Sequence, residues 1–274
     1  MIQPKTVINV KNLNLAFGSN GFKLENINDI QIKEGEIIGI LGESGCGKST
    51  FGKCLIGLIN QRDKSKYNIT TLSDSRIEVP YLNDIVKYRN LINASKDELR
   101  TYRKHAQMIF QNPRSSLNLN MPVPDILEEA IRINEPNISN RNLEKKIHTL
   151  TDQFEITGQK AKAKPKNLSG GERRRLEICR CLITNPRVLL LDEPMAGVDL
   201  LSIQDIKSLL LKLQSRPDPV SCIISDHNAG QLLKIVDRAV VLANGIIVAN
   251  DSPRKLVNHP EARRLYFGED FTSF

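Results

Sequence analysis

The feature that most constrains this chain is a glycine-rich loop between a predicted strand and a predicted helix. Residues 36–41 form a short apolar run that predicts a buried strand, and the apolar stretch at residues 51–59 predicts a helix. The pattern G-x-x-x-x-G-K-[ST] stands between them, and in this setting it is typical of a phosphate-binding loop. The loop consists of Gly42, Glu43, Ser44, Gly45, Cys46, Gly47, Lys48, Ser49 and Thr50.

The residue types of this phosphate loop suit the binding of a nucleotide. Its glycines allow backbone N–H groups to turn toward the β- and γ-phosphates without a Cβ in the way. The helix that follows directs its positive end toward the same anion. We expect Lys48 to contact the β- and γ-phosphate oxygens and the hydroxyl of Ser49 to be a ligand of Mg²⁺.

Composition and charge exclude several other classes of protein. Of the 274 residues, 40% are hydrophobic and 26% are charged, as in an ordinary globular protein. No apolar run reaches the roughly 18 residues that span a bilayer, and residues 1–5 do not look like a secretory signal. The net charge is +8, but only 5% of the residues are aromatic and none interleave with the basic clusters. We therefore expect no binding of nucleic acid, and any membrane role requires a partner.

The five cysteines indicate the redox compartment. They show no C-x-x-C spacing, and their number is odd. Free thiols in a reducing cytoplasm fit this pattern. Cys46 lies inside the phosphate loop, where a small residue that fills space is the default interpretation.

Two phenylalanines near the N-terminus are candidates for an adenine contact. Residues 7–10 and 12–17 alternate apolar and polar side chains, which predicts an early β-hairpin. Phe17 lies at the end of the second predicted strand and could present an aromatic face to adenine. Phe22 competes for the same role, and a core position for Phe17 is the alternative.

The middle of the chain predicts a helical insert. Ser95 followed by Glu98 forms a capping box for a helix that ends near His105. A short apolar strand then precedes Gln111. The helical patterns that follow, from about residue 113 to 166, separate two halves that carry the predicted sheet strands.

Two adjacent carboxylates follow an apolar run at residues 188–191. Such a run predicts a strand that is covered on both faces, as in a parallel sheet. Ligands of open α/β sheets bind at the carboxyl ends of the strands. We therefore expect Asp192 to hold Mg²⁺ through water and Glu193 to orient an attacking water.

Three further segments belong to the same pattern. Ser169 and the glycines after it open a predicted helix, where they could form a second anion site, although a plain N-cap is the alternative. His227 follows another buried strand and could reach a γ-phosphate from the same sheet edge. Asn244-Gly245 predicts a tight hairpin between residues 239–243 and 246–249.

The order of these motifs resembles the ATP-binding-cassette family over nearly the whole chain. This resemblance implies a single α/β P-loop NTPase domain over residues 1–274, with a mostly parallel core sheet, an antiparallel β subdomain and a helical subdomain at about 113–166. It also implies ATP hydrolysis in a head-to-tail dimer. The motifs that carry it are the phosphate loop, Gln111, Leu168-Ser169-Gly170-Gly171-Glu172, Leu191-Asp192-Glu193-Pro194, Asp199 and His227.

The resemblance also implies a role for each candidate residue. Glu193 would be the catalytic base, His227 the histidine that senses the γ-phosphate, and Gln111 the glutamine that senses Mg²⁺ and the coupled partner. Asp199 would lie in a loop at the dimer contact. The signature that contacts the nucleotide of the opposite subunit would be Ser169, Gly170, Gly171 and Glu172, and the Mg²⁺ ligands would be Ser49, Gln111 and Asp192.

The two halves of the chain are similar to different branches of the family. Residues 110–118 and 39–50 resemble the ATPases of oligopeptide, dipeptide and nickel importers. Residues 169–175, 226–228 and 264–271 resemble the lipopolysaccharide-export ATPase. The direction of transport and the cargo stay open at this point.

The resemblance implies an ATPase bound peripherally to the cytoplasmic face of the cell membrane. Its partners would be transmembrane permease subunits and a second ATPase subunit, identical or related. A soluble cassette protein with no membrane partner is one alternative, against which the single cassette and the lack of sustained heptads argue. A regulator that binds but does not hydrolyse ATP is another, against which Asp192 and Glu193 argue.

The segment after Gln111 is the predicted contact with the permease. It carries more apolar side chains than a free surface loop needs, which favours a groove for a short permease helix. Packing within the helical insert is the alternative. These apolar residues are Leu117, Leu119, Met121, Val123, Ile126 and Leu127.

Overall fold

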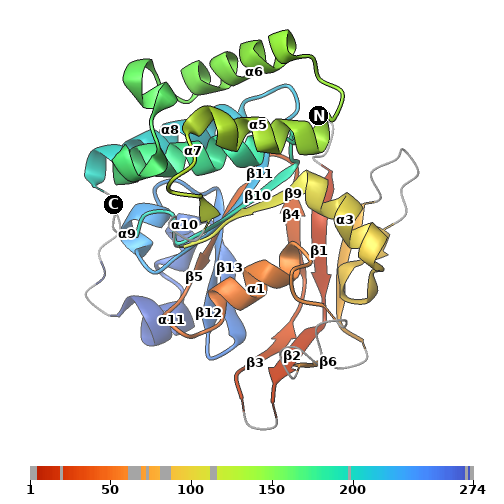
Figure 1. Cartoon of the computed structure of the whole chain (residues 1–274). Coiled ribbons are helices and arrows are strands. Elements are labelled where there is room, and N and C mark those ends of the chain that lie inside the picture. The colour runs from red at the N-terminus through yellow and green to blue at the C-terminus, as the bar shows by residue number, and fades with distance from the viewer. Residues whose placement is uncertain are drawn as a thin grey trace.

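A central six-stranded sheet organises the molecule (Figure 1). The computed structural model describes residues 5–18, 21–60, 69–71, 74–80, 88–111, 116–196, 199–268 and 271. Within these ranges the sheet order is β13-β12-β5-β11-β10-β9, parallel throughout except that β13 runs antiparallel to β12. The strands are β5 (Ile37–Leu41), β9 (Ala106–Ile109), β10 (Val188–Asp192), β11 (Ser221–Asp226), β12 (Arg238–Ala243) and β13 (Ile246–Asp251).

The central strands separate two hydrophobic cores, because successive side chains of a strand point to opposite faces. On β10, Leu189 and Leu191 belong to one core, whereas Val188 and Leu190 belong to the other. Every residue of β10 is buried. The strand covered on both faces that the apolar run predicted is therefore confirmed.

Two smaller antiparallel sheets share the second core with the helix that follows the phosphate loop. Their strand orders are β4-β1-β7-β8 and β3-β2-β6. Together with the parallel core they confirm the predicted α/β class with an added antiparallel unit. The strands are β1 (Thr6–Lys11), β2 (Leu13–Phe17), β3 (Lys23–Ile27), β4 (Ile30–Lys33), β6 (Ile69–Thr71), β7 (Arg76–Pro80) and β8 (Tyr88–Asn90).

The predicted hairpin between β1 and β2 is wrong. β1 pairs with β4 and β7, whereas β2 pairs with β3 and β6. Asn12 alone separates the two strands, with φ at 49°, and one residue is too short to reverse the chain. The chain instead continues from one sheet into the next. The predicted hairpin of β12 and β13 is confirmed, since Asn244 and Gly245 both have the positive φ that a type I′ turn needs.

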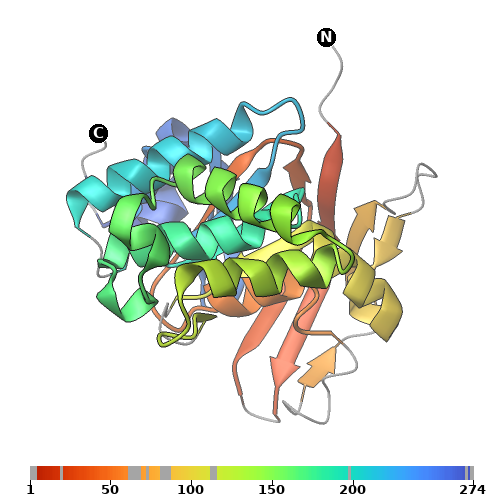
Figure 2. The same ribbon diagram turned by 45° about the horizontal axis from the view of Figure 1, so that its top comes forward.

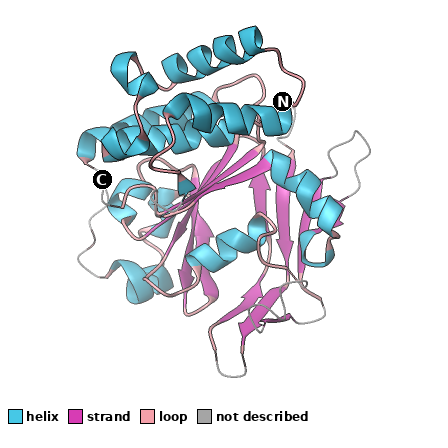
Figure 3. Cartoon of the chain, in the orientation of Figure 1, coloured by secondary structure: helices cyan, strands magenta, loops and turns pink. Residues whose placement is uncertain are grey.

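Helices α5, α6, α7 and α8 form a layer over one face of the central sheet, whereas α1 packs in the second core on the other face (Figures 2 and 3). α5 contacts α6 and α7, and α7 contacts α8. No helix in the described part of the chain is long and apolar enough to cross a membrane. The longer helices are α1 (Lys48–Leu55), α3 (Lys96–His105), α5 (Val123–Asn134), α6 (Asn140–Gln153), α7 (Gly170–Leu182) and α8 (Leu200–Gln214).

Short helical turns connect these elements. α9 (Ala229–Leu232) follows β11, and α10 (Pro253–Leu256), α11 (Pro260–Ala262) and a π-helical turn, η5 (Arg263–Phe267), follow β13. The 3₁₀ turns are η2 (Leu91–Asn93), η3 (Gly158–Lys162) and η4 (Pro165–Asn167).

The sequence predicted the start of α3 correctly and the start of α1 three residues too late. The capping box before α3 is present, since the Ser95 hydroxyl accepts from the Glu98 N–H and the Glu98 carboxylate accepts from the Ser95 N–H. α1 begins at Lys48, three residues before the apolar stretch that predicted it. It ends before Gly57, whose φ of 66° stops a helix. The first helical turn therefore includes Ser49 and Thr50.

The helical layer also corrects the predicted permease contact. Leu117, Val123 and Leu127 are buried in the first core, so they pack the helices rather than line an open surface. Ile126 is also buried in that core, but it lines a hollow between α3, β9 and α5. Leu119 and Met121 are partly buried. The alternative of internal packing holds for Leu117, Val123 and Leu127.

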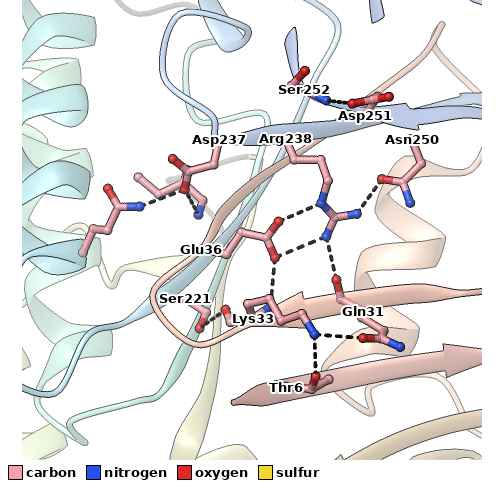
Figure 4. A network of polar contacts seen from close by, with 12 residues as sticks. Thr6, Gln31, Lys33, Glu36, Ser221, Asp237, Arg238, Asn250, Asp251 and Ser252 are labelled. Atoms are coloured by element: carbon pink, nitrogen blue, oxygen red, sulfur yellow. Dashed lines mark hydrogen bonds and ion pairs between the residues drawn. The ribbon is translucent and has the colours of Figure 1, made fainter. Parts of the chain in front are cut away.

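A network of polar contacts lies at the end of the central sheet that is farther from the phosphate loop (Figure 4). Arg238, at the start of β12, donates from Nε to Oε1 of Glu36 at 2.7 Å and from Nη2 to the Gln31 carbonyl at 2.6 Å. Asp237 accepts from the Ile37 N–H at 2.9 Å. These charge-assisted bonds fasten β4 of the antiparallel sheet to β5 and β12 of the central sheet.

Candidate nucleotide-binding site

The phosphate loop joins β5 to α1 through backbone conformations that favour glycine. The φ angles of Gly42, Gly45 and Gly47 are 155°, 84° and 108°. A Cβ at Gly42 would lie 2.2 Å from the Leu242 carbonyl oxygen, and one at Gly47 would lie 2.3 Å from Cζ of Phe22. The backbone conformation therefore favours glycine at all three positions. At Gly42 and Gly47, any larger residue would also clash with neighbouring atoms.

Lys48 is held over the loop by backbone carbonyls. Its ammonium donates to the carbonyl oxygens of Gly42 at 2.8 Å and Glu43 at 2.9 Å. The side chain is only 4% exposed. Neutral carbonyls orient this buried cation without cancelling its charge, so it strongly favours an anion beside the loop.

The predicted Mg²⁺ ligands Ser49 and Asp192 are in direct contact, although 143 residues separate them. The Ser49 hydroxyl donates to Oδ1 of Asp192 at 2.9 Å, and the Ser225 hydroxyl donates to the same oxygen at 2.6 Å. Such hard oxygen donors suit Mg²⁺, which proteins usually hold with one or two carboxylates plus substrate phosphates. No group of three or more His, Cys, Asp or Glu side chains that could hold a metal ion exists in the described ranges.

Two candidate catalytic residues, Gln111 and His227, converge on a carboxylate oxygen of the third, Glu193. Gln111 donates from Nε2 to Oε2 of Glu193 at 2.6 Å, and Nδ1 of His227 lies 3.6 Å from that oxygen. The backbone of Glu193 is in the left-handed region, with φ at 45°, and its N–H donates to the Ser225 carbonyl at 2.8 Å. A non-glycine residue held in this conformation stores strain that is common at active sites.

A pocket of about 450 Å³ lies between the phosphate loop and these residues. Both aromatic candidates line it, with ring centroids 6.3 Å apart. Phe22 also covers Gly47. The structure thus keeps Phe17 and Phe22 as candidates for contact with a base. The pocket is lined by Phe17, Phe22, Ser44, Gly45, Gly47, Lys48, Ser49, Thr50, Gln111 and Glu193.

The signature residues do not line this pocket. Ser169, Gly170 and Asp199 are exposed, whereas Gly171 and Glu172 are buried. The Ser169 hydroxyl accepts from the Glu172 N–H at 3.2 Å, and the Glu172 carboxylate accepts from the Ser169 N–H at 2.9 Å. The N-cap that sequence reasoning kept as an alternative is therefore present. The hydroxyl proton of Ser169 can still be donated to an anion.

Cys46 fills space inside the loop. Its side chain belongs to the second core, and burial raises the pKa of its thiol above the usual value. All five cysteines are free and buried. The thiol of Cys46 therefore stays protonated, as expected for a small packing residue.

Sequence reasoning missed a buried ion pair that ties α7 to the strand end before Gln111. Arg174 donates from Nη1 to the Phe110 carbonyl and to Oε2 of Glu177, both at 3.0 Å, and both side chains are 1% exposed. Ser116 donates to the same carboxylate. The sequence shows three consecutive arginines, and helical spacing places both Arg173 and Arg174 within reach of Glu177, so no signal in the sequence singles out Arg174.

A second hollow, of about 560 Å³, lies on the edge of the molecule between α3, β9 and α5. One wall is basic and carries Arg100, Arg103 and Lys104. The other wall includes Phe110 and Ile133, which are 38% and 73% exposed. We call this hollow the α3–α5 groove.

Comparison with known proteins places these features in context. Residues 24–196 match a family model described as ABC transporter. The lipopolysaccharide export system ATP-binding protein LptB of Escherichia coli K12 is 31% identical over 258 residues, which cover 94% of this chain and 96% of LptB. The dipeptide transport ATP-binding protein DppF of Lactococcus lactis subsp. cremoris is 30% identical over 263 residues, which cover 95% of this chain and 79% of DppF.

A solved structure shares the fold. The ATP-binding cassette MJ0796, described as a dimer in a post-hydrolysis state with ADP and Pi, superposes with a TM-score of 0.71. The match covers 90% of this chain and 99% of MJ0796, at 23% identity. At that identity the likeness supports the fold and says nothing by itself of individual residues.

Proposed function

This chain belongs to the ABC transporter family of ATP-binding subunits, and from that premise we propose how its residues bind and hydrolyse ATP. The observation that carries the proposal is the convergence of Gln111 and His227 on one carboxylate oxygen of Glu193 beside the phosphate loop. ATP would occupy the pocket that Phe17, Phe22 and the loop line. Its γ-phosphate would then face Glu193.

Different residues of the pocket have different roles in phosphoryl transfer. Lys48 and the loop N–H groups bind the phosphates, and Glu193 aligns the attacking water and accepts its proton. Ser49, Asp192 and Gln111 are the residues that would hold Mg²⁺, which when bound neutralises phosphate charge. Positioning and electrostatic stabilisation supply most of the rate in this chemistry.

A second ATPase subunit, identical or related, would complete each site. The exposure of Ser169, Gly170 and Asp199 outside the pocket supports this part of the proposal. Ser169 opens α7, a helix of 13 residues whose N-terminal dipole favours an anion. In a head-to-tail dimer it would face the γ-phosphate bound by the other subunit.

Substitutions of Asp226 and His227 test which of these two residues acts in ATP hydrolysis. His227→Ala is expected to lower kcat more than about tenfold, because the imidazole lies beside Glu193, where charge develops. Asp226→Ala is expected to keep at least roughly a third of the activity, because the buried Asp226 carboxylate does not line the nucleotide pocket and affects the turn only through the bond that its Oδ1 accepts from the Asn228 N–H at 2.9 Å. Phosphate release by the purified chain at saturating ATP measures both. A greater loss in Asp226→Ala would reverse the two roles.

Transmembrane permease subunits would dock from the membrane side onto the α3–α5 groove, with the chain bound peripherally at the cytoplasmic face. The groove begins at Phe110, next to Gln111, so a bound helix would lie one residue from the nucleotide pocket. The basic wall favours a permease helix with an apolar face and acidic residues.

Ile133→Glu tests this docking site, because Ile133 is exposed and its substitution does not disturb the core. We expect co-purification with the permease and transport to fall at least about tenfold, while ATP binding by the isolated chain is unchanged. Leu211→Glu is the matched control, since Leu211 is also exposed but lies on α8, outside the groove. Equal losses in the two variants, or none in Ile133→Glu, would place the permease contact elsewhere.

A further inference from the structure

The C-terminal segment packs beside the catalytic loops, although no step described so far uses it. η5 is a π-helical turn, a rare conformation that often occurs at functional sites. Its Tyr266 and Phe267 rings meet edge to face at 5.1 Å, and Phe267 contacts Phe271 at 4.8 Å. All three rings pack against the first core. The segment is therefore fixed in place, and so is the phenol ring of Tyr266.

The hydroxyl of Tyr266 joins two loops of the nucleotide site. It donates to the carbonyl oxygen of His227 at 2.8 Å. Burial raises the pKa of Tyr266 far above its usual value, the negative charge of Asp226 adds to this shift, and a hydrogen bond with the Gly42 backbone opposes it. The phenol thus stays protonated and remains a donor. Its hydrogen-bond acceptor is the backbone of His227, the residue that carries the candidate imidazole.

The C-terminal segment and the phosphate loop line the same pocket. Leu265 and Tyr266 line a pocket of about 490 Å³, and residues 43–46 of the phosphate loop form another part of its wall. The segment thus borders both the loop that binds phosphate and the loop that carries His227.

The loop that carries His227 has few other restraints. It is short, lies between β11 and the four-residue helix α9, and its imidazole is half-exposed. The Asn228 N–H bonds to Asp226, and the Ala229 N–H donates to the His227 carbonyl at 3.2 Å. The Tyr266 hydroxyl, at 2.8 Å, makes the shorter bond to that carbonyl and the one that comes from outside the turn. Since a displacement of about 1 Å can cost on the order of a hundredfold in rate, a hydrogen bond to this carbonyl can control how well the imidazole is placed.

We infer that Tyr266 is a positioning residue for hydrolysis, whose hydroxyl holds the His227 loop in register with the phosphate loop. The inference rests on the role proposed above for His227. Tyr266 does not touch the reacting atoms, so it acts on turnover through His227 and not on the binding of ATP.

Tyr266→Phe tests this inference, since it removes one hydroxyl and keeps the ring packing. In the purified full chain we expect kcat to fall about three- to tenfold, the effect of losing one neutral hydrogen bond. KM for ATP should stay within about twofold. The matched control is Tyr102→Phe, whose buried hydroxyl donates to the Leu55 carbonyl at 2.9 Å, away from the nucleotide pocket. It should lower the melting temperature and leave kcat unchanged.

A double-mutant cycle separates this inference from the proposed role of His227. If Tyr266 acts through His227, adding Tyr266→Phe to His227→Ala should change kcat by less than about 1.5-fold. A wild-type rate in His227→Ala would reject the role of His227 itself. Two outcomes would overturn the inference about Tyr266 alone. One is a low rate in His227→Ala with normal turnover in Tyr266→Phe. The other is an equal effect of Tyr266→Phe in the wild-type protein and in His227→Ala.

Discussion

Glu193→Gln is expected to stop repeated ATP hydrolysis, lowering kcat at least about a hundredfold, while ATP binding is kept. The amide has nearly the same shape as the carboxylate and can still contact Gln111, but it cannot accept a proton from water. Gln111 donates to the Glu193 carboxylate at 2.6 Å, and both residues line the nucleotide pocket. ATP that cannot be cleaved should hold two subunits together.

Phosphate release and gel filtration in the presence of ATP measure the two parts of this expectation. Glu34→Gln is the matched control, because it makes the same chemical change before β5, at the end of the sheet opposite to the phosphate loop. It should leave turnover and oligomeric state as in the wild type. Turnover within about twofold of wild type in Glu193→Gln would assign the catalytic base to another residue.

Lys48→Ala is expected to weaken ATP binding by a factor between about ten and 150. A charge-assisted contact with phosphate contributes roughly 1.5–3 kcal/mol, which converts to this range. The side chain also bonds the carbonyls of Gly42 and Glu43, so its removal loosens the loop as well. Both effects lower affinity for the triphosphate.

Titration calorimetry with ATP measures the affinity, and thermal unfolding without nucleotide shows whether the variant is folded. Lys53→Ala is the control, since Lys53 lies in the last turn of the same helix and does not line the pocket. Its affinity should match the wild type. An unchanged affinity in a folded Lys48→Ala protein would refute the assignment of the phosphate loop.

Local sequence patterns predicted the parts of this fold that local chemistry decides. The apolar run of β10, the glycines of the phosphate loop and the Asn244-Gly245 turn each have a conformation that a few neighbouring residues determine. The same reasoning failed for β1 and β2, because the partners of these strands come from residues far along the chain. Alternation reveals a strand but not its neighbour.

The site was predicted in a different way. Order and spacing of the motifs, through their resemblance to a family, indicated that Gln111 and Glu193 belong together, although 82 residues separate them. Neither periodicity nor charge would have paired them. The Arg174–Glu177 pair and the Tyr266 hydroxyl bond escaped prediction because both depend on burial in the folded chain. A basic cluster and a C-terminal aromatic residue look the same in sequence whether they are buried or solvated.

The buried Arg174 links two ends of one subunit that, in the proposed dimer, touch different ATP molecules. Its guanidinium holds the carbonyl of Phe110, next to Gln111, on the helix that begins at Ser169. Gln111 would face the nucleotide of its own subunit, and Ser169 the nucleotide of the other. In that dimer, a shift that one ATP causes at Gln111 would reach the second ATP through α7. Thermodynamic reciprocity would then require each ATP to alter the affinity for the other by the same factor, so the proposed dimer would bind its two nucleotides with coupled affinities.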